Sequence, residues 1–343
     1  MQLSTILSYS GDPRAAADQV AALEAAGLDT IWVAEAYGFD SPTLMGYLAA
    51  RTERVRIGSA ILNVYSRTPT LLAQTAAGLD NVSGGRAVLG LGASGPQVVE
   101  GWHGMPYDRP LGRTREAIEI VRSALRREVV RHDGRSFTLP LPADQGTGLG
   151  KPLKMLTHPE RSSVPVYVAA LGPRSVESTA EIADGWLPFL FSPEGAAGVW
   201  GDALAAGFAR RSADLGPLQV VGGGLVAVGD DVEDRLDLAR PHAALYIGGM
   251  GAKGKNFYHQ LACQYGFEAE ADQVQELFLA GKKREAEAAV PRALLEQTNL
   301  VGPEGHVRER IEAYREAGVT DLQVLPVDED PVGLVRRLKE WVA

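Results

Sequence analysis

The chain has a single cysteine, no long apolar run and no excess of positive charge, and each of these shortages excludes a class of protein. Because Cys263 stands alone, no internal disulfide can form, and the sequence predicts a reducing, cytoplasmic location. We interpret Cys263 as a small buried hydrophobic residue rather than a nucleophile. No apolar run reaches the roughly 18 residues that cross a bilayer, and the N-terminus lacks the pattern of a signal peptide, so no membrane partner is expected.

The charge balance also narrows the possible partners. The 343 residues carry 34 Lys and Arg against 43 Asp and Glu, a formal net charge of −9. A chain without a broad basic surface is not expected to bind nucleic acid, and this favours a small-molecule partner. Hydrophobic residues make up 45% of the sequence, which is enough for a large core. Since α/β barrels of this length commonly form one unit, we expect a single domain over residues 1–343.

Short apolar strands alternate with amphipathic helices along most of the chain. The predicted strands are Gln2–Leu7, Thr30–Ala34, Arg56–Leu62, Ala87–Leu91, Val164–Ala170, Trp186–Leu187, Gln219–Val228 and Asp321–Leu325. Several helices end in Ala-Gly or Ala-Asp-Gly directly before a strand, as at Ala26-Gly27 and Ala317-Gly318. Glycine accepts the left-handed turn that such a connection needs. About eight repeated units of this kind predict an α/β fold, a (β/α)8 TIM barrel with parallel strands.

Two segments interrupt the alternation. Glu128–Val164 is rich in glycine and proline, and residues 249–300 begin with a glycine-rich stretch and continue as short helices. We interpret both as insertions in βα loops that cap the C-terminal face of the barrel, where active sites of this fold lie.

Two glycine-containing turns are candidate ligand sites. Gly90-Leu91-Gly92-Ala93-Ser94-Gly95 matches G-x-G-x-x-G, but the next clear helix is predicted near Arg113 and no second strand follows, which argues against a dinucleotide fold. Small residues there still allow backbone N–H groups to approach a ligand. Ala170-Leu171-Gly172 leads into a helix at Pro173, a natural phosphate site or an ordinary turn. The small residues from Gly58 to Asn63 indicate a flat neighbour or a bulge.

The sequence shows no pattern of residues that is typical of a metal site. The six histidines are scattered without ligand spacing, and His103 is the most suggestive because it follows the fourth strand's loop. No lysine falls clearly at the end of a core strand. A metal-dependent or Schiff-base barrel enzyme is therefore not favoured.

One long segment carries a resemblance to a known family. Ser83-Gly84-Gly85-Arg86 and the run from Gly90 to Trp102 resemble the fourth strand and following loop of the luciferase-like superfamily, in particular its members that use coenzyme F420. Arg67-Thr68-Pro69, Leu149–Lys154, Gly248–Gly251 and Asn256-Phe257-Tyr258 are similar to further family segments, so the likeness covers nearly the whole chain.

This resemblance implies a deazaflavin site at the barrel mouth. The ring would rest on a bulge at Ala60-Ile61, which contains a non-proline cis peptide in relatives. Residues implied to contact or adjoin the ring and its ribityl chain are Glu35, Ala60, Ile61, Asn63, Ala93, Ser94, Gly95, Gln97 and Val98. Ala170, Leu171 and Gly172 would hold the phosphate. The carboxylates of the coenzyme tail would meet Lys151, Lys154, Lys253 or Lys255, or these lysines are simply solvated.

The resemblance also implies a reaction, although two residues of this chain differ from those of some relatives. Relatives that oxidise sugar phosphates have a histidine where this chain has Ala36 and a glutamate where Gly95 stands, so that activity is not expected. We expect hydride transfer to or from a small alkene, carbonyl or alcohol, with Glu35, Glu100 and His103 as candidate acids by position. An FMN-dependent monooxygenase and a non-enzymatic deazaflavin-binding protein are the alternatives. Relatives are often dimers, so a homodimer is expected.

Overall fold

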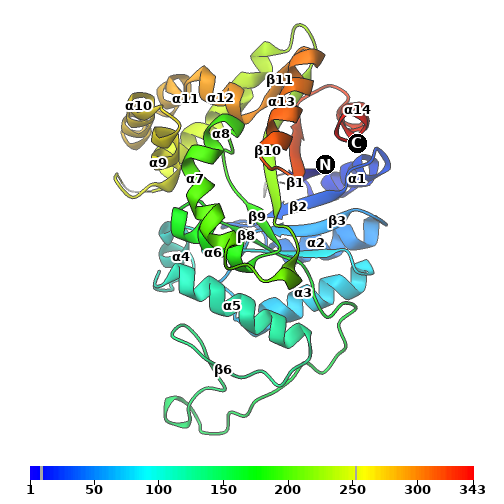
Figure 1. Ribbon diagram of the computed structural model, residues 1–343, viewed down its shortest axis with the longest axis vertical. Helices are drawn as coiled ribbons and strands as arrows, with labels where there is room; N and C mark the ends of the chain where they lie inside the picture. Colours follow the sequence, from blue (N-terminus) through cyan, green and yellow to red (C-terminus); the bar gives the residue numbers. More distant parts are fainter. Residues whose placement is uncertain (8–10, 252) are drawn as a thin grey trace.

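A parallel sheet closes on itself to form a (β/α)8 barrel in the computed structural model, which describes residues 1–7, 11–251 and 253–343 (Figure 1). The barrel strands, each parallel to the next and the last to the first, are β1 (Gln2–Leu7), β2 (Thr30–Ala34), β3 (Arg56–Ala60) with its continuation β4 (Leu62–Asn63), β5 (Ala87–Gly92), β8 (Val166–Ala169), β9 (Gly185–Leu187), β10 (Gln219–Val228) and β12 (Asp321–Pro326). The predicted fold is confirmed, and most predicted strand bounds agree to within two residues.

Helices surround this barrel. The outer ring comprises α1 (Pro13–Ala25), α2 (Ser41–Arg51), α3 (Pro69–Ser83), α5 (Pro110–Leu125), α6 (Pro173–Ile182), α7 (Pro193–Phe208), α13 (Glu304–Glu316) and α14 (Pro331–Val342). Many of these helices have a proline in the first turn and a capping side chain just before it. In α2, for example, Asp40 accepts a hydrogen bond from the Thr43 N–H. Gly27 and Gly318 have φ of 108° and 89°, so the glycines of the predicted helix-to-strand signature do make left-handed turns.

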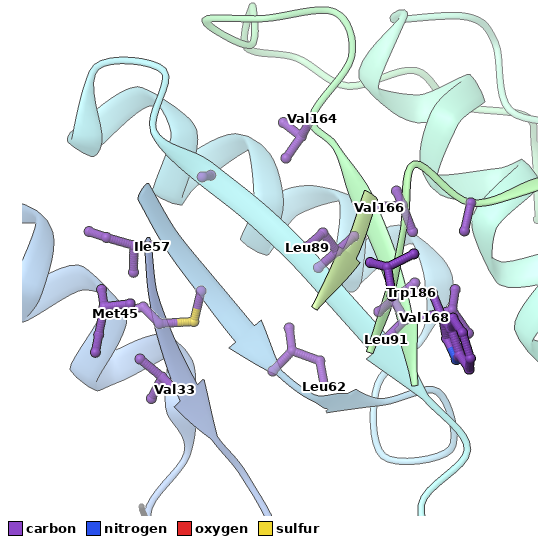
Figure 2. Packing of buried hydrophobic residues seen from close by; sticks show 14 of the residues in the cluster. Val33, Met45, Ile57, Leu62, Leu89, Leu91, Val164, Val166, Val168 and Trp186 are labelled. Carbon is purple, nitrogen blue, oxygen red and sulfur yellow. The ribbon is translucent and has the colours of Figure 1, made fainter. Parts of the chain in front are cut away.

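The main core lies between the barrel and this ring. Figure 2 shows Val33, Ile57, Leu89 and Val166 projecting from successive strands, with Met45 of α2 packed over the first two. Alternate residues of each strand face the inside of the barrel, so their side chains form a layer separate from the main core. Trp32 and Tyr167 fill that interior with ring centroids 5.2 Å apart.

Glycines make room for these two rings. A Cβ on Gly58 would lie 2.3 Å from the Trp32 ring, and one on Gly185 would lie 2.4 Å from the Tyr167 ring. The lack of bulk at Gly58 therefore serves an internal neighbour. The bulge interpretation also applies to this segment, because the strand is interrupted at Ile61 between β3 and β4.

The first insertion lies at the opposite end of the barrel from the one predicted. Residues 126–165 join the end of α5 to the start of β8, and a helix-to-strand connection returns the chain to the amino ends of the strands. The prediction that 128–164 caps the C-terminal face is therefore wrong. The segment contains a hairpin, β6 (His132–Asp133) and β7 (Thr138–Leu139), and the turn Ala143–Gln145. Figure 1 shows it beyond α5, far from α10 and α11.

The second insertion follows a strand and so lies at the carboxyl ends. It runs over residues 229–299, starting earlier than the predicted 249, and its short helices are η3 (Glu233–Ala239), α8 (Arg240–Ala244), the π-helix η4 (Leu245–Gly249), α9 (Phe257–Gln264), α10 (Glu268–Leu279), α11 (Lys283–Ala289) and α12 (Arg292–Thr298). Ile247, Val274 and Leu294 belong to a separate apolar cluster within it. Strand β11 (Leu300–Gly302) then pairs with the end of β10.

A short helix also corrects the interpretation of the glycine motif. Helix α4 (Pro96–Gly101) begins directly after Gly95, and α5 begins at Pro110 rather than near Arg113. The chain then continues through α5, so the second strand of a dinucleotide fold is still missing. Among the described residues, no helix is long and apolar enough to cross a membrane.

Candidate active site

Small side chains form much of the carboxyl-terminal rim of the barrel. Ala34 at the end of β2 is paired with Ala60 of β3, and Asn63 of β4 with Gly92 of β5. Ala169 ends β8 on the same rim. Short side chains at these positions would let a flat molecule approach the strand ends.

The bulge between β3 and β4 presents a buried donor without a partner. The Ala60–Ile61 peptide bond is cis, as the resemblance implied. The Oδ1 atom of Asn63 accepts a hydrogen bond from the Tyr65 N–H at 2.8 Å, which fixes the orientation of the amide. Its Nδ2 atom is buried and has no partner among the described residues. A buried donor left unpaired is costly, so this position suits a ligand acceptor.

The loop after β5 is held from outside by an aromatic pair. Ala93 and Ser94 lead to Gly95, which precedes α4 and its residues Gln97 and Val98. The Tyr107 hydroxyl donates to the Ser94 carbonyl at 3.2 Å.

The Tyr107 ring stacks on Tyr65, with ring centroids 5.3 Å apart, and the Arg113 guanidinium lies 4.6 Å from the centre of the Tyr65 ring. Burial raises the pKa of Tyr65 to about 12, so this hydroxyl stays a neutral donor, here to the Asp108 carbonyl.

Two buried tryptophans brace the loop Ala170–Gly172. The Trp186 indole N–H donates to the Ala170 carbonyl at 2.9 Å, and the Trp200 indole N–H donates to the Leu171 carbonyl at 2.8 Å. In a trans peptide the N–H points opposite to the C=O, so the N–H groups of Leu171 and Gly172 point away from these indoles. They add to the positive N-terminal end of α6, which favours an anion. The sequence indicated this loop as a candidate phosphate site, but it did not indicate the two tryptophans that hold it.

Glu35 forms an ion pair instead of presenting a free carboxyl group. Both of its oxygens accept hydrogen bonds from the Arg67 guanidinium, at 2.9 Å in the longer case, and one also accepts from the Ser41 N–H at 2.8 Å. The two side chains are 10% and 14% exposed. This pair joins the end of β2 to the starts of α2 and α3. Arg67 was noted in the sequence only as part of a family segment.

The other two candidate acids flank helix α4. Glu100 is exposed and accepts a hydrogen bond from the Tyr107 N–H at 3.2 Å. His103 is half-buried just beyond the helix, where its backbone N–H donates to the Val98 carbonyl. In the described ranges, no group of three or more His, Cys, Asp or Glu side chains is arranged to hold a metal ion.

An aromatic cluster that the sequence did not indicate adjoins β9 at the mouth. Phe189, two residues beyond β9, stacks on Tyr246 at 4.1 Å and lies 5.3 Å from the His242 ring. Tyr258 of α9 packs edge-on against both Phe189 and Tyr246. His242 is exposed to solvent, but the protein around its ring lowers the pKa of the imidazole by desolvation, which favours the neutral form. The π-helix η4, which carries Tyr246, places this ring in the cluster.

The candidate lysines fall into two groups. Lys253 and Lys255 are exposed in the turn before α9, whose Phe257 ring lies 3.7 Å from the position of a Cβ on Gly172, so this turn adjoins the braced loop. Lys151 and Lys154 instead flank Leu153, whose carbonyl accepts from the Val130 N–H near the end of α5. The structure therefore does not bring Lys151 to the mouth.

Comparisons with known proteins agree with this arrangement. Residues 1–321 match the sequence profile of the luciferase-like monooxygenase family. The chain is 42% identical over 329 residues to a predicted coenzyme F420-dependent oxidoreductase of Mycobacterium tuberculosis, with 94% of each protein covered. It is 28% identical over 312 residues to the 5,10-methylenetetrahydromethanopterin reductase of Archaeoglobus fulgidus, covering 90% of this chain and 87% of that protein.

A solved structure shows the same fold. The coenzyme F420-dependent tetrahydromethanopterin reductase of Methanopyrus kandleri matches with a TM-score of 0.82, covering 99% of this chain and 98% of its own. The two sequences are 22% identical, so this likeness concerns the fold alone.

Proposed function

Since this chain belongs to the luciferase-like monooxygenase family, we propose that it binds coenzyme F420 at the barrel mouth and acts as an oxidoreductase on a small organic substrate. The observation that carries the proposal is the braced loop Ala170–Gly172 beside a rim of alanine and glycine. Together they suit a molecule with a flat ring and a phosphate.

The residues present fit this coenzyme. The unpartnered Asn63 Nδ2 suits a carbonyl or ring nitrogen of a flat heterocycle. The outward N–H groups of Leu171 and Gly172 suit the phosphate, and Lys253 with Lys255 suits the carboxylates of the tail. Lys151 is left out of this site because it lies with the first insertion.

When bound, the deazaflavin supplies a donor or acceptor of hydride. The chain's own contribution is closeness and alignment, which hydride transfer needs more than reactive side chains. The Glu35–Arg67 pair fixes the end of β2, and Tyr107 fixes the Ser94 loop. An alkene, a carbonyl or an alcohol would be a suitable partner for hydride exchange with the bound coenzyme.

Among the three candidate acids, we propose that His103 is the residue that donates a proton to the substrate or accepts one from it. Glu35 is engaged by Arg67, and Glu100 is engaged by the Tyr107 N–H. His103 follows the loop after β5 directly and is half-buried. Replacement His103→Gln should lower kcat by roughly 100-fold or more, while the affinity for coenzyme stays unchanged. A wild-type kcat for this variant contradicts the assignment.

A fluorescence titration with coenzyme F420 and with FMN tests the cofactor. We expect saturable quenching by the deazaflavin and weaker binding of FMN. Preference for FMN places the protein with the flavin monooxygenases, and F420 binding without turnover of any alkene, carbonyl or alcohol favours a coenzyme-carrying protein.

The tryptophan braces offer a sharper test of the phosphate loop. Trp200→Phe removes one N–H donor while keeping a ring in the core, so it should weaken F420 affinity by about 5- to 10-fold. Trp102→Phe is the matched control, because Trp102 is 65% exposed and braces nothing in the loop. Equal affinities for the two variants contradict the bracing role.

A homodimer is the second part of the proposal. The one charged residue of α3 is Asp80, which is buried, and the exposed residues of this helix include Leu71, Gly78 and Val82. A barrel helix that faced only water would normally carry charges, so a second copy of the chain is its fitting partner. Gly78→Arg should yield monomers by light scattering, whereas Gly198→Arg on α7 should not.

A further inference from the structure

The residues assigned to the coenzyme occupy one half of the barrel rim. Glu35 follows β2, Asn63 ends β4, and the two glycine-containing loops follow β5 and β8. These strands are consecutive neighbours in the barrel, and the strand opposite the β3–β4 bulge is β10, with β9 beside it. A ring that rests one face on the bulge therefore turns its other face toward β9 and β10.

Phe189 stands on that opposite side, two residues beyond the end of β9. The Leu187 side chain packs in the barrel interior against the cluster that contains Trp32 and Tyr167. Because alternate side chains of an extended chain share a face, Phe189 returns to the inward side above Leu187. The ring contacts of Phe189 agree with this placement, since its partners belong to the insertion over the carboxyl ends of the strands.

Phe189 and its partners form an aromatic wall made of Phe189, His242, Tyr246 and Tyr258. Phe189 stacks on Tyr246, and the His242 ring lies 4.6 Å from the Tyr246 ring. Phe189 is only half-buried, and none of the apolar clusters formed by the described residues includes it. The wall is therefore not part of either core, and no role assigned above uses it.

This wall favours flat, uncharged molecules. The phenyl ring of Phe189 carries no ionisable group, and desolvation lowers the pKa of His242, so its imidazole adds no positive charge at neutral pH. Aromatic rings attract one another beyond the effect of apolar burial, which improves affinity between about twofold and tenfold for each pair.

We propose that the aromatic wall packs against the substrate and that the substrate is planar beside its reacting group, as in an aryl ketone, a conjugated carbonyl compound or the corresponding alcohol. The inference rests on the proposed function, because the coenzyme ring lies on the other side of the substrate. Hydride transfer needs reacting atoms about 3–3.5 Å apart. A planar substrate meets this need as a single flat layer between the ring and Phe189.

Calorimetric titration of the purified protein with acetophenone and with cyclohexyl methyl ketone tests this proposal. The two ketones share one carbon skeleton and only the first has a flat ring, so apolar burial alone gives acetophenone no advantage. We expect acetophenone to bind about three- to tenfold more tightly. Phe189→Leu keeps an apolar side chain but removes the ring, so it should abolish this preference, whereas Phe189→Tyr should retain it.

Phe208→Leu is the matched control, because Phe208 is 47% exposed at the end of α7, which points to the amino ends of the strands. If Phe189→Leu does not fold, Tyr246→Leu carries the same test, since it removes the ring that stacks on Phe189. Equal affinities of the wild-type protein for the two ketones, or an equal preference in the Phe189→Leu and Phe208→Leu variants, overturns the proposal.

The titrations need no coenzyme, so their outcome is separate from that of the proposed function. Failure of F420 to bind would overturn that function while leaving the ketone preference intact. Normal F420 binding without a ketone preference would remove only the role of the aromatic wall.

Discussion

The two insertions of this barrel both contain a glycine-rich stretch, but they lie at opposite ends of the strands and are held in different ways. Residues 126–165 extend along the flank from the amino ends of the strands, and residues 229–299 fold into helices over the carboxyl ends. Both interrupt the β/α alternation with glycine-rich stretches. The type of connection, helix-to-strand or strand-to-helix, decides the face, and composition does not report it.

Different forces hold the two insertions. The helical one buries Ile247, Val274 and Leu294 in its own apolar cluster. The extended one leaves Leu149 and Leu156 84% and 93% exposed and has no cluster of its own among the described residues. Phe137, Leu139 and Met155 pack against the main core, and polar contacts add to this attachment. Glu116 of α5 accepts backbone N–H groups of the hairpin, and although burial opposes this, these bonds lower the pKa of its carboxyl group.

The largest difference should appear when one leucine is removed from each insertion. Leu294→Ala empties a fully buried site and should lower the free energy of unfolding by about 2–5 kcal/mol, whereas Leu156→Ala should change it by less than about 0.5 kcal/mol. Chemical denaturation measures both. Similar losses would show that the extended insertion has a packed core after all.

A buried carboxyl group at the amino ends of the strands should change stability without affecting the mouth. Burial raises the pKa of Asp321 from 3.8 to about 6, with Arg56 3.8 Å away. The folded state therefore binds this proton more tightly, and stability falls as pH rises from about 4 to 6 and stays lower above that. Asp321→Asn should stabilise by up to about 3 kcal/mol at pH 8 and by nothing near pH 4.

Melting curves at both pH values test this, with F420 affinity as the control that should not move. A gain of equal size at pH 4 and pH 8 would mean that ionisation of Asp321 is not the cause.

The attachment of the extended insertion should depend on one charge. Glu116→Gln weakens charge-assisted bonds to the hairpin, at a local cost of about 1–2 kcal/mol. Because the folded pKa of Glu116 is lowered, its contribution is complete above its unfolded value near 4.5 and is lost as pH falls below that. Hydrogen exchange should therefore rise in residues 132–139 but not in 257–298. Faster exchange in both regions would count against a local anchor.

The smallest expected effect is the change in coenzyme affinity when a lysine of each insertion is replaced. Lys253→Ala should weaken F420 affinity by about two- to fivefold, and more at low salt, because its turn leads into Phe257, whose ring lies beside Gly172 of the proposed phosphate loop. Lys151→Ala should leave the affinity unchanged. The comparison between the insertions fails if the Lys151 variant is the weaker binder.

Much of the fold could be predicted, and the site only in part. Strand and helix bounds followed from apolar periodicity, proline at helix starts and glycine at helix ends, which are local signals. The loops at Ala60–Asn63 and Ala170–Gly172 were found because small residues at strand ends are visible in sequence. Arg67, Trp200 and His242 were missed as site residues because their partners lie far away along the chain.

The sequence by itself determined the alternation and the positions of the strand ends, because each depends on residues within a turn or a strand of one another, and the count of about eight units predicted the closed barrel. Tertiary structure decided which insertion lies at the carboxyl ends of the strands, which candidate acid is held in an ion pair and where a pocket opens between α1 and α2. Ion pairing of Glu35 with Arg67, the bracing of a loop by Trp186 and Trp200 and the space between α1 and α2 all arise only when distant segments pack together. Packing brings together residues whose separation along the chain carries no sign of their contact.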